Sequence, residues 1–414
     1  MKTARRRYLR ALGPGVITGA ADDDPAGITT YSVAGAQFGL GLLWLAPLTW
    51  PLMAAVQSTC ARVGMVTGGG LMDALRRKFS RPVLLVAAVA LFAANTFNVG
   101  ADLSGMADAA EQLTGVTSRV WVLVFGISIG WATVQLHYST IAKVMRWLVL
   151  VLFAYVIAAF SIGPDWREVA RATLLPTMPR GAEWAMVVAI LGTTISPYLF
   201  FWQASAEVEE EIAAGRTQRA QRVGATQDEI VMGRVDIGVG TFFGNLTFFF
   251  ITLTTALTLH RHGITHPGTT NEVASALRPI AGPFATQLYT IGILGTGVLA
   301  IPTLAGSAAY ALCELFDWPE GMDERPLAAP RFYCVFALSI ALSIGAEFAN
   351  FSPVRALYLS AIINGVLAPF LLAGIVAVAS DARIMEGQPS PLVSRVGVVI
   401  TTVAMFVAAL AMAM

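Results

Sequence analysis

Three consecutive carboxylates near the N-terminus are the residues of this chain best suited to binding a cation. Asp22, Asp23 and Asp24 stand directly before Pro25 in an otherwise apolar stretch. Proline lacks a backbone donor and clashes with the preceding turn, so the sequence predicts a break in the helix here. A charge at the centre of a bilayer costs about 2.5 to 3.5 kcal/mol, so three carboxylates there would require water or a cation. We expect Asp22 and Asp23 to line a vestibule, or alternatively to form salt bridges or cap a half-helix.

A second proline interrupts an apolar stretch near the middle of the chain, in the run Gly192-Thr193-Thr194-Ile195-Ser196-Pro197-Tyr198. Broken backbone at membrane depth is tolerated only where it lines a cavity or is buried by protein. The two matching breaks therefore predict a single site, formed where they meet. The alternative is that each proline only kinks an ordinary membrane helix, and the pairing of two such breaks disfavours it.

The composition indicates an integral membrane protein. Of the 414 residues, 56% are hydrophobic and only 13% are charged, and the mean hydropathy is +0.66, which is too apolar for a soluble chain of this length. A net charge of +1, with arginines in short clusters, excludes a nucleic-acid partner. The sequence has no phosphate-binding loop, metalloprotease helix or nucleophile elbow, so we expect neither an enzyme nor a resident cofactor.

Apolar stretches of roughly 20 residues predict about eleven transmembrane helices in an all-α protein. The predicted helices are 13–39, 43–66, 82–112, 119–137, 143–163, 183–212, 234–259, 284–316, 329–347, 353–379 and 392–413.

Lysine and arginine collect in alternate connections between these helices. The basic groups at 2–10, 76–81 and 216–222 would all lie on one side of the membrane. The positive-inside rule then predicts a multi-pass protein of the plasma membrane with a cytoplasmic N-terminus. Asp236, at the predicted start of the helix 234–259, is interpreted as a helix-start or loop charge, or alternatively as part of a cytoplasmic exit path.

The helices can be divided into two repeats with a broken segment leading each. The first repeat covers about 11–163, the second about 183–379, and an extra helix follows at 392–413, all within one transmembrane domain. Five helices per repeat would invert the second copy relative to the first, a plan found in many secondary transporters. Such transporters bind substrate near the bilayer midplane, where the breaks would face each other.

Three short runs carry a resemblance to a known family. Gly13-Pro14-Gly15, Asp24-Pro25-Ala26-Gly27-Ile28 and 34–39 resemble the first helix of the Nramp family of divalent metal transporters, whose signature there is Asp-Pro-Gly-Asn. The segment 192–205 is similar to the family's sixth helix, with its Met-Pro-His core. The resemblance implies an amino-acid-transporter-like fold that holds a metal ion between the unwound parts of helices one and six.

The resemblance also implies which positions contact the metal. Asp24 keeps the family's metal-binding carboxylate, and Gly27 stands where the family has its binding asparagine. Thr193 stands at the position whose backbone carbonyl coordinates metal. Ser196 replaces the family's metal-binding methionine.

Other departures concern the family's proton route. Tyr198 and Gln203 replace two histidines of the sixth helix, and Gly105 stands where helix three would carry a glutamate. Asp102 matches an acidic residue of that route and would share a helix face with Asn98. An alternative role for Asp102 is a hydrogen bond to a neighbouring helix.

Loss of the thioether changes the ion that we expect. Thioether sulfur favours soft or borderline ions, so a hydroxyl at this position admits hard ions, and Mg²⁺ keeps several waters and needs only one or two carboxylates. The magnesium-transporting branch related to this family also lacks the methionine. We therefore expect a transporter of Mg²⁺, with Mn²⁺ admitted, that runs passively or with weak proton coupling and without an obligate protein partner.

Two other functions were weighed against this one. The same fold could carry a small organic solute, an amine or an amino acid, but Asp22 to Asp24 would repel an anionic one. A metal sensor that does not transport is disfavoured because the sequence shows no sizeable soluble domain.

Overall fold

All regular secondary structure in the computed structural model is helical. The structure describes residues 13–135, 152–346 and 352–414. The α-helices are α2 (Pro14–Asp22), α3 (Pro25–Phe38), α4 (Leu45–Thr67), α5 (Leu71–Arg76), α6 (Arg81–Thr114), α7 (Ser118–Gln135), α9 (Phe153–Ile162), α10 (Trp166–Leu174), α11 (Glu183–Thr194), α12 (Pro197–Ala213), α13 (Arg219–Arg222), α14 (Gln227–Thr258), α15 (Thr270–Ala274), α16 (Arg278–Ala281), α17 (Ala285–Phe316), α18 (Pro330–Ala346), α19 (Pro353–Ala379) and α20 (Leu392–Ala413). Three short 3₁₀ turns are η2 (His260–His262), η3 (Ser275–Leu277) and η4 (Gly282–Phe284). The predicted helix 143–163 begins outside the described residues and ends as α9.

Both predicted helix breaks are present. α2 ends at Asp22 and α3 begins at Pro25, while α11 ends at Thr194 and α12 begins at Pro197. In each pair the proline occupies the first helical position, where its missing N–H costs no hydrogen bond and its fixed φ suits a new helix. Each break therefore separates two half-helices, and neither is a simple kink.

Each broken helix packs against the long helix that follows the other one. α4, which follows α3, packs against α12. α14, which comes after α12 and the short α13, packs against α2 and α3. Glycine allows both contacts to bring backbones together: a Cβ at Gly64 would lie 2.3 Å from the Ala204 carbonyl oxygen, and a Cβ at Gly240 would lie 2.2 Å from that of Gly15. Small residues at helix interfaces permit this approach in membrane proteins. The reciprocity is the arrangement expected of two inverted repeats.

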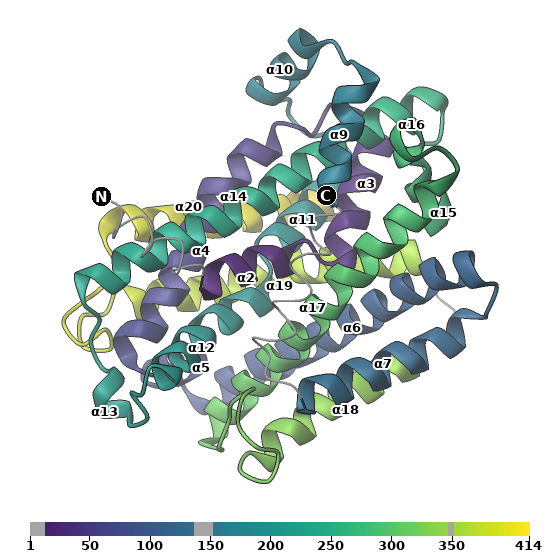
Figure 1. Ribbon diagram of the computed structural model, residues 1–414. Helices are drawn as coiled ribbons and strands as arrows, with labels where there is room; N and C mark the ends of the chain where they lie inside the picture. The colour runs from purple at the N-terminus through teal and green to yellow at the C-terminus, as the bar shows by residue number, and fades with distance from the viewer. Residues whose placement is uncertain (1–12, 136–151, 347–351) are drawn as a thin grey trace, which may run out of the picture.

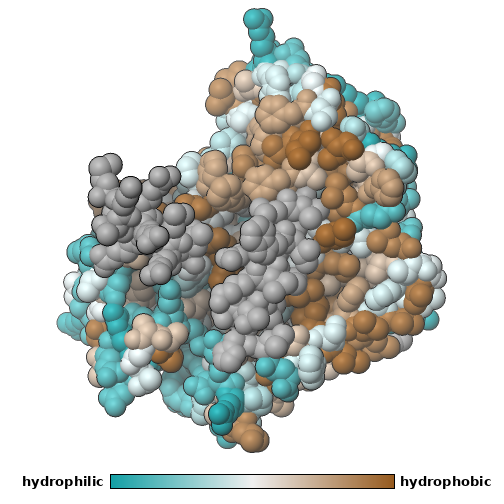
Figure 2. Space-filling model, in the orientation of Figure 1, coloured by the Kyte–Doolittle hydropathy of each residue, from teal (hydrophilic) through white to brown (hydrophobic). Residues whose placement is uncertain are grey.

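Six helical segments in the described part of the chain are long and apolar enough to cross a membrane. They are Arg81–Thr114, Glu183–Ala213, Gln227–His262, Thr270–Phe316, Pro353–Ala379 and Leu392–Ala413. Phe153–Ile162 and Pro330–Gly345 are shorter apolar helices. Large apolar side chains are exposed on the outer helices, for example Val86 (70%) and Leu410 (65%), and hydrophobic residues cover much of the face in Figure 2. This surface is suited to contact with lipid.

The short helices gather at two opposite ends of the bundle. α5 and α13 lie at one end, and α10, α15 and α16 lie at the other (Figure 1). Ion pairs tie the connection after α5 to the segments that follow α17 and α19: Arg76–Asp317, Arg77–Glu386 at 3.1 Å and Lys78–Asp381 at 2.8 Å. We call the end that carries α5 and α13 the basic end.

Candidate functional site

The carboxylate of Asp24 is fixed by the half-helix that begins after it. Asp24 is the N-cap of α3, and its Oδ1 accepts the backbone N–H of Gly27 at 2.6 Å. Because Pro25 has no N–H and Asp24 is only 2% exposed, this oxygen satisfies one of the few free donors of the first turn. The other oxygen, Oδ2, is left for contacts outside α3.

A tyrosine from the second break connects the two broken segments. The hydroxyl of Tyr198 donates to the carbonyl oxygen of Ala21 at 2.8 Å and lies 3.5 Å from Oδ2 of Asp24. The same Oδ2 accepts the side-chain N–H of Asn98, on α6, at 3.2 Å. The structure thus brings Asp24, Asn98 and Tyr198 together at the point where the breaks meet.

The absence of a side chain at Gly27 allows three oxygen atoms to approach its backbone closely. A Cβ at this residue would lie 3.0 Å from Oγ1 of Thr193, 3.1 Å from the carbonyl oxygen of Asp22 and 3.3 Å from Oδ1 of Asp24. Oxygen from carboxylates, carbonyls and hydroxyls is the donor type that hard divalent cations prefer. Gly27, Thr193 and Asp24 are therefore adjacent, although they come from both breaks.

Ser196 is turned toward the end of its own half-helix. Its hydroxyl donates to the carbonyl oxygens of Gly192 and Thr193, each at 2.7 Å. A hydroxyl and a carbonyl each offer two lone pairs, so Ser196 and Thr193 retain acceptor capacity after this bond. The last carbonyls of α11 also lie at the negative end of its helix dipole, which favours a cation.

Asp102 completes the acidic part of the site from α6. It is fully buried, lies one turn beyond Asn98 and is close enough to Asp24 for the two carboxylates to interact. Among the described residues, neither carboxylate oxygen of Asp102 has a hydrogen-bond partner, and the same holds for Oδ1 of Asn98. Buried acceptors without donors are costly, and a cation or a proton would remove that cost.

Asp22 and Asp23 point to a different helix from Asp24. Both are buried, and a Cβ on Gly244 of α14 would lie 3.4 Å from Oδ2 of Asp22 and 4.0 Å from Oδ1 of Asp23. Within 13–135, 152–346 and 352–414, neither forms an ion pair, and both carboxylate oxygens of Asp22 lack a hydrogen-bond partner. The alternative of salt bridges therefore finds no support in the described chain, and the acidic triplet is divided between two directions.

Gln203 contacts a carboxylate further along α12. Its side-chain N–H donates to Oε1 of Glu207 at 2.8 Å. Glu207 in turn lines a cavity of about 240 Å³, together with Glu210, Asp236 and Arg216. Gln203 thus lies between the breaks and this cavity, more than one helical turn beyond Tyr198.

Asp236 has a role that the sequence interpretation missed. α14 begins at Gln227, so Asp236 lies inside the helix and its interpretation as a helix-start charge was wrong. Its carboxylate accepts the N–H of Gly13 at 3.0 Å and the N–H of Gly15 at 2.6 Å, and so caps α2 from another element. The signal in the sequence was Gly13, which provides no side chain of its own to cap α2.

The described side chains form no cluster of metal ligands at the breaks. In the part of the chain that the structure describes, no three side chains of His, Cys, Asp or Glu lie together as metal ligands would. An ion at the breaks would be bound by Asp24, neutral oxygens and water.

Comparisons with known proteins agree with this arrangement. The family model described as natural resistance-associated macrophage protein-like, Nramp, matches residues 15–414. The divalent metal cation transporter MntH of Deinococcus radiodurans is 25% identical over 310 residues, which are 73% of this chain and 68% of the relative. The transporter of the same name from Yersinia pestis (strain Pestoides F) is 25% identical over 349 residues, 80% of each chain.

Solved structures share the fold. A manganese transporter of Eremococcus coleocola, in complex with an aromatic bis-isothiourea substituted compound, superimposes with a TM-score of 0.72 at 15% identity, over 99% of this chain and 87% of that one. MhsT in complex with L-phenylalanine gives 0.58 at 14% identity, over 96% and 98%. The predicted all-α transporter fold, with two discontinuous helices, is confirmed.

Proposed function

The chain belongs to the Nramp family, and on this premise we propose that it carries a divalent metal cation across the membrane, Mg²⁺ first with Mn²⁺ admitted. The ion would lie between the two helix breaks. The observation that carries the proposal is the meeting of both breaks at Asp24, where Tyr198 joins α12 to the Ala21 carbonyl. The MntH relatives are divalent metal cation transporters by name.

The donor set supports a hard ion. Asp24 offers one carboxylate, and the neighbouring groups from Thr193, Ser196 and the Asp22 carbonyl are all oxygen atoms. Mg²⁺ is bound by one or two carboxylates and retains waters, whereas a thioether would favour softer ions. A side chain at Gly27 would crowd these oxygen atoms.

The proposed transport is passive or only weakly coupled to protons. Tyr198 and Gln203 cannot exchange a proton near neutral pH as histidine does, and both are engaged in hydrogen bonds. The titratable carboxylates that interact with Asp24 are Asp102, Asp22 and Asp23, and of these Asp102 matches the acidic residue of the family's proton route. An organic solute is a weaker candidate because its carboxylate would meet buried acidic residues.

The proposed orientation places the basic end in the cytoplasm of a cell whose plasma membrane holds the protein. Arg76, Arg77 and Lys78 of that end follow the positive-inside rule. The acidic cavity at Glu207 and Asp236 would then lie on the cytoplasmic side of the breaks and accept the ion after it leaves Asp24.

The test is ion uptake into proteoliposomes that contain a divalent-metal dye. Asp24→Asn keeps the shape of the side chain and removes its charge, so uptake of Mg²⁺ should fall to the level of empty liposomes. Asp228→Asn, at an exposed acid in the first turn of α14, is the matched control and should transport normally. Wild-type uptake by Asp24→Asn would remove this carboxylate from the site.

A further inference from the structure

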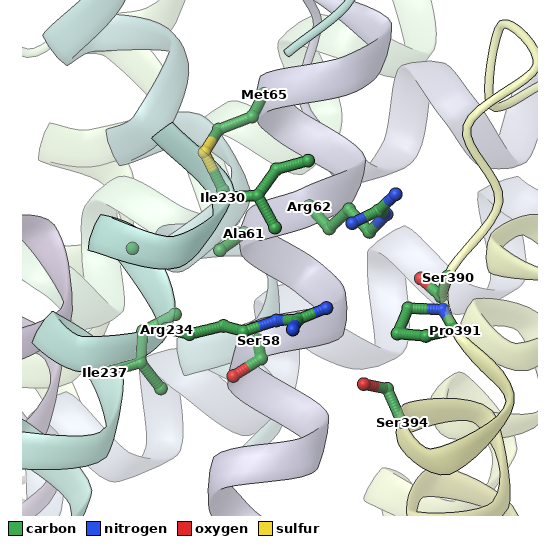
Figure 3. A pocket seen from close by; sticks show the side chains of 11 residues that line it. Ser58, Ala61, Arg62, Met65, Ile230, Arg234, Ile237, Ser390, Pro391 and Ser394 are labelled. Atoms are coloured by element: carbon green, nitrogen blue, oxygen red, sulfur yellow. The ribbon is translucent and has the colours of Figure 1, made fainter. Parts of the chain in front are cut away.

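A small cavity lies between α4, α14 and the segment that leads into α20 (Figure 3). Two arginines line it, Arg62 from α4 and Arg234 from α14, and three serines accompany them: Ser58, Ser390 and Ser394. Figure 3 shows the side chain of Arg234 extending across toward the stretch from Ser390 to Ser394. The cavity shares Met65 and Gly233 with the acidic cavity at Glu207, but its arginines and serines are not among the residues assigned to the ion.

The two arginines are not neutralised by carboxylates. Among residues 13–135, 152–346 and 352–414, neither Arg62 nor Arg234 forms an ion pair, and the two guanidinium groups are close enough to repel each other. Arg62 donates its Nε to the carbonyl oxygen of Gln388 at 3.2 Å. By contrast, Arg77 and Lys78 at the same end each contact a carboxylate. Two adjacent, uncompensated cations indicate a place for an anion.

A buried hydroxyl provides a second, independent indication. Ser390 is only 1% exposed, lines the cavity, and its Oγ has no hydrogen-bond partner in the described part of the chain. Buried polar atoms in native proteins are almost always paired. A hydroxyl can donate to an anionic oxygen, so Ser390 fits the same occupant as the arginines.

The surroundings of the cavity are apolar and face outward. Leu392 and Val393, at the start of α20, are 67% and 84% exposed, and Val231 and Val235 of α14 are 47% and 48% exposed. Beyond Arg395 in its first turn, α20 is predominantly apolar, and only 28% of its most apolar window is buried, which is suited to contact with acyl chains. The occupant should therefore combine an anionic group with an apolar body.

We propose that this cavity binds the phosphate of an anionic membrane lipid, whose acyl chains lie along α14 and α20. Guanidinium groups bind phosphate through paired, charge-assisted hydrogen bonds. Basic pockets between membrane helices on the cytoplasmic side are suited to anionic headgroups. The cavity itself is small, about 10 Å³, which is room for about one water. The phosphate therefore sits at the mouth, between the two long arginine side chains.

The experiment is native mass spectrometry of the full chain in detergent, with added phosphatidylglycerol or phosphatidylcholine. Wild-type protein should retain one phosphatidylglycerol in preference to phosphatidylcholine. Arg62→Gln and Arg234→Gln should each weaken retention by about tenfold, since each removes a charge-assisted contact. Arg383→Gln changes an exposed arginine in the connection between α19 and α20 and serves as the matched control, with normal retention.

Thermal stability provides a readout that does not depend on the variants. Phosphatidylglycerol should raise the Tm of the wild-type protein more than phosphatidylcholine does, and glycerol phosphate at the same concentration should have no effect. Equal retention of both lipids, or unchanged retention in both arginine variants, would overturn the proposal. Stabilisation by glycerol phosphate equal to that by the lipid would also overturn it, because the site would then take a soluble phosphate.

Discussion

Replacement of Gly27 by alanine tests whether the space between the breaks holds the transported ion. The added methyl group would lie 3.0 Å from Oγ1 of Thr193, 3.1 Å from the Asp22 carbonyl oxygen and 3.3 Å from Oδ1 of Asp24. All three distances are tight, so the neighbouring oxygens must shift by a few tenths of an ångström. Two of these three atoms, the Asp22 carbonyl oxygen and Oδ1 of Asp24, belong to the break to which we assign the ion.

The expected magnitude follows from two opposing effects. Overpacking of a filled site costs about 1 to 3 kcal/mol, whereas alanine in place of glycine in a helix contributes about 0.5 to 1 kcal/mol of stability. Gly27 keeps its backbone donation to Asp24 when it is replaced, because that bond uses the main-chain N–H. We therefore expect Tm to change little and the affinity for Mg²⁺ to fall about tenfold, which corresponds to about 1.4 kcal/mol.

The assay is the concentration dependence of Mg²⁺ uptake into dye-loaded proteoliposomes. Gly238→Ala is the matched control, because no atom lies within 4 Å of the Cβ position at this glycine of α14. The control should transport as the wild type does. If Gly27→Ala shows the wild-type concentration dependence, the ion does not occupy the space beside Gly27 and the reasoning from this geometry fails.

Three further predictions concern selectivity, coupling and pH. Ser196→Met adds a soft ligand and should shift competition uptake from Mg²⁺ toward Mn²⁺ or Cd²⁺; an unchanged ratio would count against this position as a metal contact. Mg²⁺ entry should acidify the liposome interior only slightly, as measured with an internal pH dye, and stoichiometric acidification would instead assign proton transfer to Asp102. Burial, followed by the nearby carboxylates of Glu314 and Glu209, raises the pKa of Glu320, which lies in the connection after α17. Folding therefore favours the neutral form of Glu320, and the protein loses stability as pH rises above the ordinary carboxyl range. Glu320→Gln should raise Tm at alkaline pH and leave it unchanged at acidic pH. A gain in Tm that does not depend on pH would contradict this.

The positions of both helix breaks could be predicted from the sequence because their cause is local. Pro25 and Pro197 each remove a donor and disfavour a helical preceding residue, and small and polar residues cluster beside both. Proline alone is not enough, because Pro51, Pro302 and Pro369 lie inside unbroken helices. The apolar stretches likewise mark the membrane helices, although α14 begins at Gln227, before the predicted start at 234. The interhelical contact between Asn98 and Asp24 was not predicted, because it depends on how α6 packs against α3.

The directions of several side chains could not be predicted, because they depend on helices distant in sequence. Asp22 and Asp23 turn toward Gly244, where a missing side chain leaves room for them. The Ser196 hydroxyl donates to the last carbonyls of α11. A serine at this position could donate to the backbone or point away from it, and the residue type alone does not decide between the two. Asp236 caps a helix more than 220 positions before it, and no pattern around Asp236 itself indicates that partner.

The most direct measurement is a structure of the full chain with bound Mn²⁺, with the ion located by its anomalous scattering. Metal–oxygen distances near 2.1 Å and one bridging hydrogen bond of about 2.7 Å place the expected peak within about 5 Å of the Asp24 carboxylate, between Gly27 and the end of α11. Asp24→Asn should abolish that peak. A peak elsewhere in the protein, or one that persists at full height in the variant, would contradict the assignment of the ion to the two helix breaks.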